Sequence, residues 1–202
     1  VDGEKVSRLV EFIGRFPSVT LCSSDLMLLR GSPSERRRFM DLTLSVVNRD
    51  YYTAIRDLHR GIAGRNRLLK NNGSAAELSA FEAEIAPHAS QIANYREVGM
   101  RTLSEVLCRT YDRIAEADEG PELSFRPNVD CHDTEAYCRL LYESRKRDRM
   151  IGATQRGPHR DDFNFSLQVG GAREYASDGQ QRGLCVALQI ACLLYTSDAA
   201  DE

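Results

Sequence analysis

The polar loop at residues 177–182 (SDGQQR) has the composition of a binding site for an anion. It lies just before an expected apolar helix, where the first backbone N–H groups have no partner within the helix and the positive end of the helix dipole points the same way. Gln180 and Gln181 would add hydrogen-bond donors without adding charge. A plain capped turn, with Ser177 or Asp178 as the N-cap, accounts for the same residues, so both interpretations stay open.

The segment at residues 157–162 (GPHRDD) brings together one histidine, one arginine and two carboxylates. Arg160 beside Asp161 and Asp162 could form a local cluster of ion pairs, or it could hold a loop that faces a nucleotide or DNA. His159 has no serine or cysteine nucleophile at a recognisable spacing, so the sequence does not support a hydrolase triad.

Three consecutive arginines, Arg36, Arg37 and Arg38, follow the segment GSPSE. Successive side chains on a helix point about 100° apart, so the three cannot share one salt bridge. We expect at least one of them to face a phosphate or a network of carboxylates. A solvated run of surface charge would have the same sequence.

The six cysteines and four histidines do not predict a metal site. There is no Cys-x-x-Cys pair, and the nearest approach to a zinc cluster, Cys131, His132 and Cys138, lacks a second pair of ligands. We therefore expect buried or incidental thiols rather than zinc or disulfides.

The composition is that of an ordinary water-soluble chain. Its 202 residues carry 27 basic and 30 acidic side chains, and no stretch approaches the ~20 apolar residues of a membrane-spanning helix. We therefore expect a cytoplasmic protein. Residues 30–70 hold ten basic and four acidic side chains and residues 139–160 hold seven and two, whereas residues 71–130 hold five and eleven. Such asymmetry fits an anionic partner on one face, although solvated helix surfaces give the same counts.

Short strands and capped helices are expected to position the polar segments. The pattern of apolar residues predicts strands at residues 18–22, 122–126 and 163–169, then a turn at 170–171 and a return strand at 172–175. We expect helices to begin at the N-caps Ser34, with Glu35 in the first turn, and Asp133. A further, strongly apolar helix is expected at residues 180–191.

Two long amphipathic helices should lie between the first two strands. Apolar residues at three- and four-residue steps predict one long helix over residues 44–69 and a second over residues 78–114 that Pro87 could bend. Residues 71–74 form the turn, where Gly73 suits a left-handed cap. Helices joined in this way pack antiparallel, as a coiled-coil-like arm.

The last eleven residues, 192–202 (CLLYTSDAADE), differ abruptly from the helix before them. They resemble the conceptual translation of a sequencing adapter, so we expect a non-native tail that fits no element. A genuine polar tail is the alternative. Without these residues, the remaining 191 carry 27 basic and 27 acidic side chains.

Taken together and in this order, the polar segments resemble the RecF family of bacterial DNA repair proteins, which are ABC-type ATPases related to SMC-like proteins. The matching runs are DLMLLRGSPSERRRFMD (25–41), GRNRLLK (64–70), GPHRDD (157–162) and ASDGQQRGLCVALQIA (176–191). The resemblance covers residues 1–191. It implies an α/β fold, in which a partial ABC-ATPase head of mixed sheet and helices (1–40 and 119–191) carries an inserted domain with an antiparallel helical arm (41–118).

The resemblance also implies a role for the loop. Residues 177–182 would be the ABC signature loop, which contacts the γ-phosphate of ATP bound to the opposite subunit through Ser177, Asp178, Gly179, Gln180, Gln181 and Arg182. ATP with Mg²⁺ would then close a homodimer over double-stranded or gapped DNA. Such a protein would help RecR- and RecO-type mediators to load recombinase in repair, replication, recombination and the SOS response. The candidates for DNA contacts or for a network within the head are Arg36, Arg37, Arg38, Arg65, His159 and Arg160.

Several positions depart from the family pattern. Asp178 stands where a polar, uncharged residue is frequent, and a carboxylate there would oppose a triphosphate unless it faces away. Cys22 and Ser24 replace the usual Phe and Pro. The sequence has neither the phosphate loop Gly-x-x-x-x-Gly-Lys-Ser/Thr nor an apolar strand ending in two acidic residues. The resemblance puts these before residue 1 and after residue 191, so we expect an internal fragment, itself inactive and without catalytic residues, of a weak DNA-dependent ATPase.

Two other classes of protein fit parts of the pattern. A non-catalytic interaction module would use the arm to dock a partner, and its loops would only cap helices. Another SMC-like head would carry a far longer arm than the ~75 residues expected here.

Overall fold

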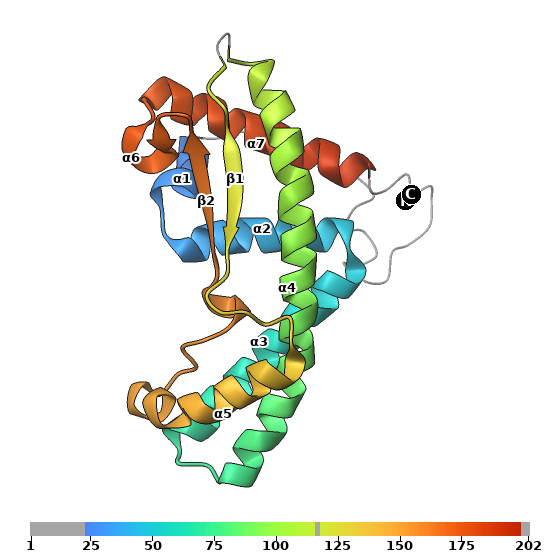
Figure 1. Ribbon diagram of the computed structural model, residues 1–202, viewed down its shortest axis with the longest axis vertical. Helices are drawn as coiled ribbons and strands as arrows, with labels where there is room; N and C mark the ends of the chain where they lie inside the picture. The colour runs from blue at the N-terminus through green and yellow to red at the C-terminus, as the bar shows by residue number, and fades with distance from the viewer. Residues whose placement is uncertain (1–22, 116–117, 199–202) are drawn as a thin grey trace. The chain divides into compact units, whose positions relative to one another are not determined.

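A computed structural model of the chain describes residues 23–115 and 118–198 and divides them between two compact units (Figure 1). Of the described residues, the first unit holds 23–48, 101–115, 118–124 and 164–198, and the second holds 49–100 and 125–163. Helix α4 (Ala75–Asp112) and strands β1 (Glu122–Arg126) and β2 (Asp162–Leu167) contribute residues to both units. The strand expected at residues 18–22 lies outside the described residues.

The first unit combines a small sheet with helices from distant parts of the sequence. β1 lies beside β2 and runs in the opposite direction, and β2 pairs antiparallel with β3 (Gly170–Gly171), so that Ser166 faces Gly171. The helical elements are η2 (Ser23–Leu26), α1 (Met27–Arg30), α2 (Pro33–Val47), α6 (Ala172–Tyr175) and α7 (Asp178–Asp198). The α/β fold class and the strand at residues 122–126 agree with the prediction from the sequence.

Helix α7 carries much of the core of the first unit. Leu184, Ala187, Leu188 and Ala191 are fully buried, and α7 packs against α1 and α2. Every second residue of β2 is buried, which confirms the alternation expected there. Among the described residues, no helix is both long and apolar enough to cross a membrane.

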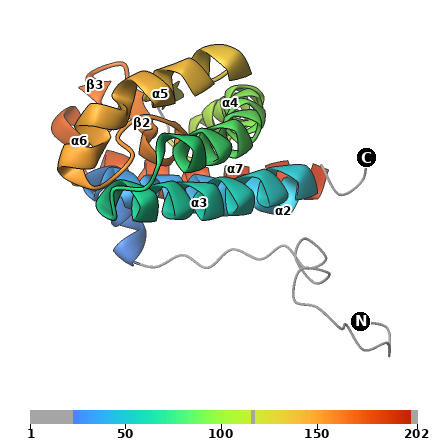
Figure 2. The same cartoon turned by 90° about the horizontal axis from the view of Figure 1, so that it is seen from below.

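The second unit is built from α3 (Arg49–Lys70), the N-terminal part of α4 and α5 (Thr134–Ile151). Figures 1 and 2 both show α3 and α5 beside this part of α4. A Cβ atom on Gly61 would lie 2.7 Å from Cγ1 of Ile85, and one on Gly64 would clash with the ring of Phe81. This register confirms that α3 and α4 pack antiparallel, and the two glycines permit their close approach.

The helix expected over residues 44–69 is two helices rather than one. Asn48 adopts an extended conformation (φ −133°, ψ 114°) between α2 and α3, while its N–H still bonds to the carbonyl of Leu44. Asparagine leaves a helix readily because its side chain competes for backbone hydrogen bonds. Apolar periodicity continued across the break and therefore concealed it.

Two of the predicted cap positions are wrong by one or two residues. Helix α2 begins after Ser32, not Ser34, because Pro33 suits the first helical position and the Glu35 carboxylate accepts from the Ser32 N–H at 2.6 Å. In the turn after α3, the residue with positive φ is Asn72 (53°) rather than Gly73. Asp133 does cap α5, as predicted, and its Oδ1 accepts from two backbone N–H groups.

The hairpin after β2 differs from its prediction. Gly170–Gly171, expected as the turn, is the short return strand β3, and residues 172–175, expected as a strand, form the helical turn α6. Val169 lies in the turn itself and is exposed. The return strand is only two residues long because the chain enters α6 directly after Gly171.

The segment expected to fit no element is helical as far as residue 198. Helix α7 runs without interruption through Asp198, and Cys192 is buried, with its Sγ 3.7 Å from Oγ1 of Thr43 in α2. The prediction of an unstructured tail is therefore wrong for residues 192–198. The non-native origin of residues 192–202 stays a prediction.

Candidate functional site

The polar loop at residues 177–182 forms the start of α7, which begins at Asp178, two residues before the predicted start. Ser177 Oγ accepts from the N–H of Gln180 at 3.2 Å, and Gln180 Oε1 accepts from the N–H of Ser177 at 2.8 Å. This reciprocal pair is a capping box, and it satisfies two backbone donors. Ser177 is thus the N-cap, one of the two alternatives that the sequence left open.

The two glutamines of the loop hold it in place. Gln181 is buried, and its Nε2 donates to the carbonyls of Ala172 and Ala176, both at 3.0 Å. Gln180 Nε2 donates to Oε1 of Glu119 at 3.0 Å. Both amides are therefore engaged within the first unit and do not serve as the spare donors that the sequence suggested.

Glu119 is fixed in turn from α4. The hydroxyl of Tyr111 donates to Glu119 Oε2, and this hydrogen bond, followed by that from Gln180, lowers the pKa of the Glu119 carboxyl. Burial is the main cause that raises the pKa of Tyr111 far above its ordinary value. A chain of contacts from Tyr111 through Glu119 to Gln180 thus supports the base of the loop.

Asp178 and Arg30 form an ion pair at the start of α7. Arg30 Nη2 lies 2.5 Å from Asp178 Oδ1, and Arg30 Nε donates to Oε1 of Gln181 at 2.5 Å. The Asp178 side chain is 78% exposed and that of Arg30 41%, so the pair adds little stability. Its consequence is local, because the guanidinium offsets the carboxylate that would repel an approaching anion.

Ser177, Asp178, Gly179 and Arg182 form the exposed rim of the loop. A Cβ atom on Gly179 would meet only Oγ of Ser177, at 3.9 Å, so no contact among the described residues requires a glycine there. Glycine within a helix costs roughly 0.5–1 kcal/mol relative to alanine. A ligand that contacts the backbone at Gly179 would explain why a glycine, without a side chain, occupies this position.

The three consecutive arginines point in different directions, as expected. Arg36 is buried, and its Nη1 donates to the carbonyl of Gly31 at 2.9 Å, which closes the turn before α2. Arg37 is half-buried and Arg38 is exposed. Arg38 is therefore the most accessible of the three to an external phosphate.

In the segment 157–162, Asp161 pairs with a distant arginine rather than with its neighbour Arg160. Asp161 is buried, and its Oδ2 lies 2.6 Å from Nη1 of Arg96, which comes from α4. Oδ1 of Asp161 accepts from the N–H of Asn128 at 2.8 Å. Of the two interpretations left open for this segment, the local ion-pair cluster does not describe Asp161, whose partner is Arg96, and Arg160 is exposed.

The same arginine of α4 fixes the turn that precedes β2. Arg96 Nη1 also donates to the carbonyl of Pro158 at 2.7 Å, and its Nε donates to Oη of Tyr51 at 3.0 Å. His159 is half-buried, with Nε2 3.0 Å from the carbonyl oxygen of Thr154. The segment is thus tied into the second unit by contacts that its own sequence does not reveal.

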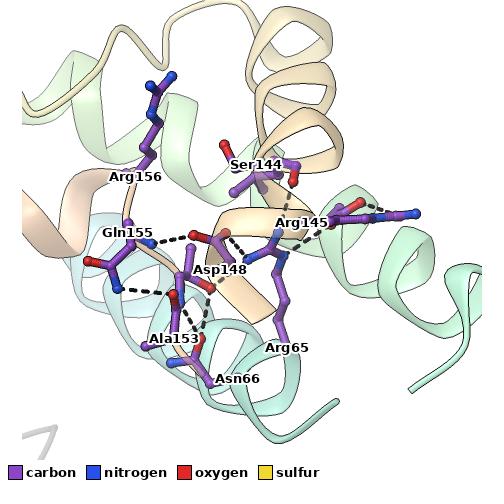
Figure 3. A network of polar contacts seen from close by, with 12 residues as sticks. Arg65, Asn66, Ser144, Arg145, Asp148, Ala153, Gln155 and Arg156 are labelled. Atoms are coloured by element: carbon purple, nitrogen blue, oxygen red, sulfur yellow. Dashed lines mark hydrogen bonds and ion pairs between the residues drawn. The ribbon is translucent and has the colours of Figure 1, made fainter. Parts of the chain in front are cut away.

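Arg65 is completely buried in the second unit. Its Nη1 lies 2.7 Å from Oδ2 of Asp148, its Nε lies 3.1 Å from Oε1 of Glu82, and its Nη2 donates to the carbonyl of Leu141 at 2.8 Å. Figure 3 shows the side chain reaching from α3 towards Asp148. A DNA contact by Arg65 is incompatible with this burial, and the network that holds Arg65 lies within the second unit.

Further polar residues complete this network. Arg145 Nη2 lies 2.5 Å from Glu82 Oε2, and the Asn66 carboxamide accepts from the N–H and the hydroxyl of Thr154. Two arginines thus face two buried carboxylates, one on α4 and one on α5. The sequence did not single out Glu82, Arg145 or Asp148. Their roles depend on which helices pack together in the fold, and no local motif reveals that.

The residues considered for zinc are engaged otherwise. His132 Nδ1 lies 2.9 Å from Asp130 Oδ1 and its Nε2 lies 3.0 Å from Glu97 Oε2. Burial raises the pKa of the Cys131 thiol to about 12, which disfavours the thiolate that binds metal. Within residues 23–115 and 118–198, no group of histidine, cysteine and carboxylate side chains is arranged to hold a metal ion.

The curated and solved proteins that resemble this chain share one name. No family model matches it. Among curated relatives, "DNA replication and repair protein RecF" of Moorella thermoacetica is 34% identical over 92% of this chain and 50% of its own length. The proteins of the same name from Herpetosiphon aurantiacus and Clostridium perfringens are each 31% identical, over 91% and 100% of this chain and 49% and 57% of theirs.

The fold agrees with that of solved structures. "The recombination mediator protein RecF-ATPrS in RecFOR pathway" superposes with a TM-score of 0.86 at 24% identity, over 100% of this chain and 57% of that chain. A second structure, "RecF-ATP in RecFOR pathway", gives a TM-score of 0.85. The chain spans about half the length of the curated relatives it matches.

Proposed function

We propose, from the premise that this chain is RecF-like over nearly its whole length, that it forms part of an ATP-binding protein of DNA replication and repair. The relatives' name supports the repair and replication role, and two structural neighbours are described as complexes with ATP or an ATP analogue. Assignment to the cytoplasm and to recombination belongs to the same proposal.

The start of α7 is the proposed point of contact with nucleotide. Ser177 and Gly179 would meet the γ-phosphate of ATP bound by a second subunit, as the signature loop of the family does. The observation that carries this proposal is the exposed Gly179, for which the described residues give no packing reason. Arg30 supports it, because its ion pair with Asp178 removes the repulsion that the carboxylate would exert.

The assembled protein would be a homodimer that ATP and Mg²⁺ close over double-stranded or gapped DNA. It would cooperate with RecR- and RecO-type mediators in loading recombinase. Arg38 and Arg160 are the exposed candidates for phosphate contacts among those named from sequence. The division into a head (1–40 and 119–191) and an arm domain (41–118) belongs to this proposal. The compact units group α5 with α3 and α4.

Two matched serines test the role of the loop. Ser32 and Ser177 each begin a capping box, with Glu35 and Gln180 as the reciprocal partners. Replacing either serine with alanine should destabilise its helix by about 1 kcal/mol. In the complete protein encoded by the gene, we expect only Ser177→Ala to abolish ATP-dependent dimerisation, measured by sedimentation velocity.

The outcomes distinguish the possible roles of the loop. If Ser177→Ala dimerises with ATP as well as Ser32→Ala does, the loop is only a helix cap. If the unsubstituted protein stays monomeric with ATP and Mg²⁺, the proposed ATP-closed dimer is wrong. The helical interaction module would then explain the chain better.

A further inference from the structure

One end of the second unit carries a dense group of exposed positive charge, here called the basic end. It consists of six residues from the end of α3, the end of α5 and the segment that follows α5: Arg67, Lys70, Lys146, Arg147, Arg149 and Arg156. All six side chains are exposed. None of the six belongs to the residues proposed above to contact nucleotide or DNA.

Direct contacts bring these three stretches of chain together. Nη2 of Arg149, in α5, donates to the carbonyl of Gly73, just after α3, at 2.8 Å. The N–H of Thr154 donates to Oδ1 of Asn66 at 2.7 Å, which ties the segment after α5 to α3. A Cβ atom on Gly152 would lie 3.3 Å from Cγ of Lys70. The three stretches that carry the six charges therefore meet at one end of a single compact unit.

The acidic residue within this region does not neutralise the surface. Asp148 is the sole carboxylate in residues 66–73 and 144–157, and it is buried against Arg65. Among the described residues, none of the six exposed cations forms an ion pair. The acidic residues that flank these stretches are the exposed Glu143, Glu77, which caps α4 through Ser74, and Asp161, which is buried and pairs with Arg96.

Helix dipoles explain only part of this arrangement. Arg67, Lys70 and Arg149 lie in the last turns of α3 and α5, where a cation interacts favourably with the negative end of the dipole. Lys146 and Arg147 lie before the last turn of α5, and Arg156 lies beyond it. Six like charges gathered at one end of the unit without ion-pair partners repel one another, which favours a polyanionic ligand.

We propose that the basic end binds the phosphate backbone of duplex DNA. This inference rests on the proposed function and adds a second contact surface to it. An acidic protein is the less favourable partner, because lysine is depleted in protein interfaces. Lysine and arginine that contact phosphates position a protein on DNA without reading its sequence.

The buried network provides a fixed base for this surface. Arg65, in α3, binds Asp148, which lies between Arg147 and Arg149 in α5. The next residue of α3, Asn66, binds Thr154 in the segment that follows α5. The cations are thus carried by backbone that is already ordered. Binding would then restrict only the exposed side chains, which lowers its entropic cost.

Charge removal at matched positions tests the proposal. The variant with Lys146→Gln, Arg147→Gln and Arg156→Gln removes three cations from the basic end. The control with Arg49→Gln, Arg60→Gln and Arg139→Gln removes three exposed cations from elsewhere in the second unit. Affinity for a fluorescent DNA duplex is measured for the complete protein by anisotropy across a range of NaCl concentrations, and melting curves verify folding.

We expect the slope of log affinity against log salt concentration to become shallower by about 3 in the first variant, and by less than about 1 in the control. Equal slopes in the two variants, or a slope unchanged from that of the original protein, would overturn the inference. Loss of binding to an acidic polypeptide but not to DNA would also overturn it. If the original protein binds no duplex, both the DNA part of the proposed function and this inference fail.

Discussion

At the scale of single residues, the arginines that look alike in the sequence have different roles because their surroundings differ. Arg65 and Arg96 are completely buried and hold carboxylates from distant segments, whereas Arg38 and Arg160 are exposed. Arg30 lies between these extremes and neutralises Asp178 at the surface. Burial, rather than position within a run of arginines, therefore decides which of them can reach a phosphate.

The Arg65 network should be sensitive to the loss of its central cation. Replacing Arg65 with leucine leaves Glu82 without one of its two arginines and Asp148 buried without its charged partner, and breaking such a pair costs about 3–5 kcal/mol. Arg60→Leu, on the same helix, removes an exposed cation and should cost less than about 1 kcal/mol. Urea unfolding of the two variants measures the difference, and equal losses would contradict the role given to the network.

His132 should titrate above its ordinary pKa of 6.5, chiefly because of its hydrogen bond with Asp130. The folded protein then favours the charged imidazole, so the stabilisation is fully present below pH 6.5 and is lost as the pH rises through the raised pKa. Asp130→Asn should lower the midpoint of the His132 resonance in an NMR titration. A midpoint that does not move would show that Asp130 is not the main cause.

At this scale the residues of the loop were predictable from the sequence, but their partners were not. Ser177 was named as a candidate N-cap, and local spacing is sufficient for that, because its partner Gln180 is three residues away. The partner of Asp161 is Arg96, 65 residues earlier in the chain. Pairs of this kind depend on how helices and loops pack, which a single sequence does not contain.

At the scale of elements, two glycines in helices should respond oppositely to the same substitution. Gly61→Ala places a methyl group 2.7 Å from the fully buried Ile85, so overpacking should destabilise the second unit by about 1–3 kcal/mol. Gly179→Ala meets no close atom and should leave the first unit unchanged or stabilise it by up to roughly 1 kcal/mol. Thermal melting checks both, and a large loss for Gly179→Ala would mean that packing within the chain, not an external ligand, requires that glycine.

Elements with clear boundaries were predictable from the sequence, and those without were not. β1 and the Asp133-capped α5 are bounded by proline, glycine and an N-cap, and they lie where expected. The break at Asn48 has no such marker, because the apolar repeat continues across it. The pairing of Gly170–Gly171 with β2 was also missed, since two glycines resemble a turn more than a strand.

At the scale of the whole molecule, a formal net charge of −3 conceals two separate candidate sites for anions. One is the exposed start of α7 in the first unit, where Arg30 offsets the charge of Asp178, and the other is the basic end of the second unit. The resemblance to RecF proteins makes nucleotide the expected ligand of the first, and charge density makes DNA the expected ligand of the second. The proposed ATP-dependent assembly rests on the first of these.

The most direct test of that claim is a structure of the complete protein with a non-hydrolysable ATP analogue and Mg²⁺. We expect two copies of the protein, with Oγ of Ser177 and the backbone N–H of Gly179 within about 3 Å of γ-phosphate oxygens of the nucleotide held by the partner subunit. A nucleotide-bound protein in which the start of α7 faces solvent, or contacts only its own chain, would contradict the account.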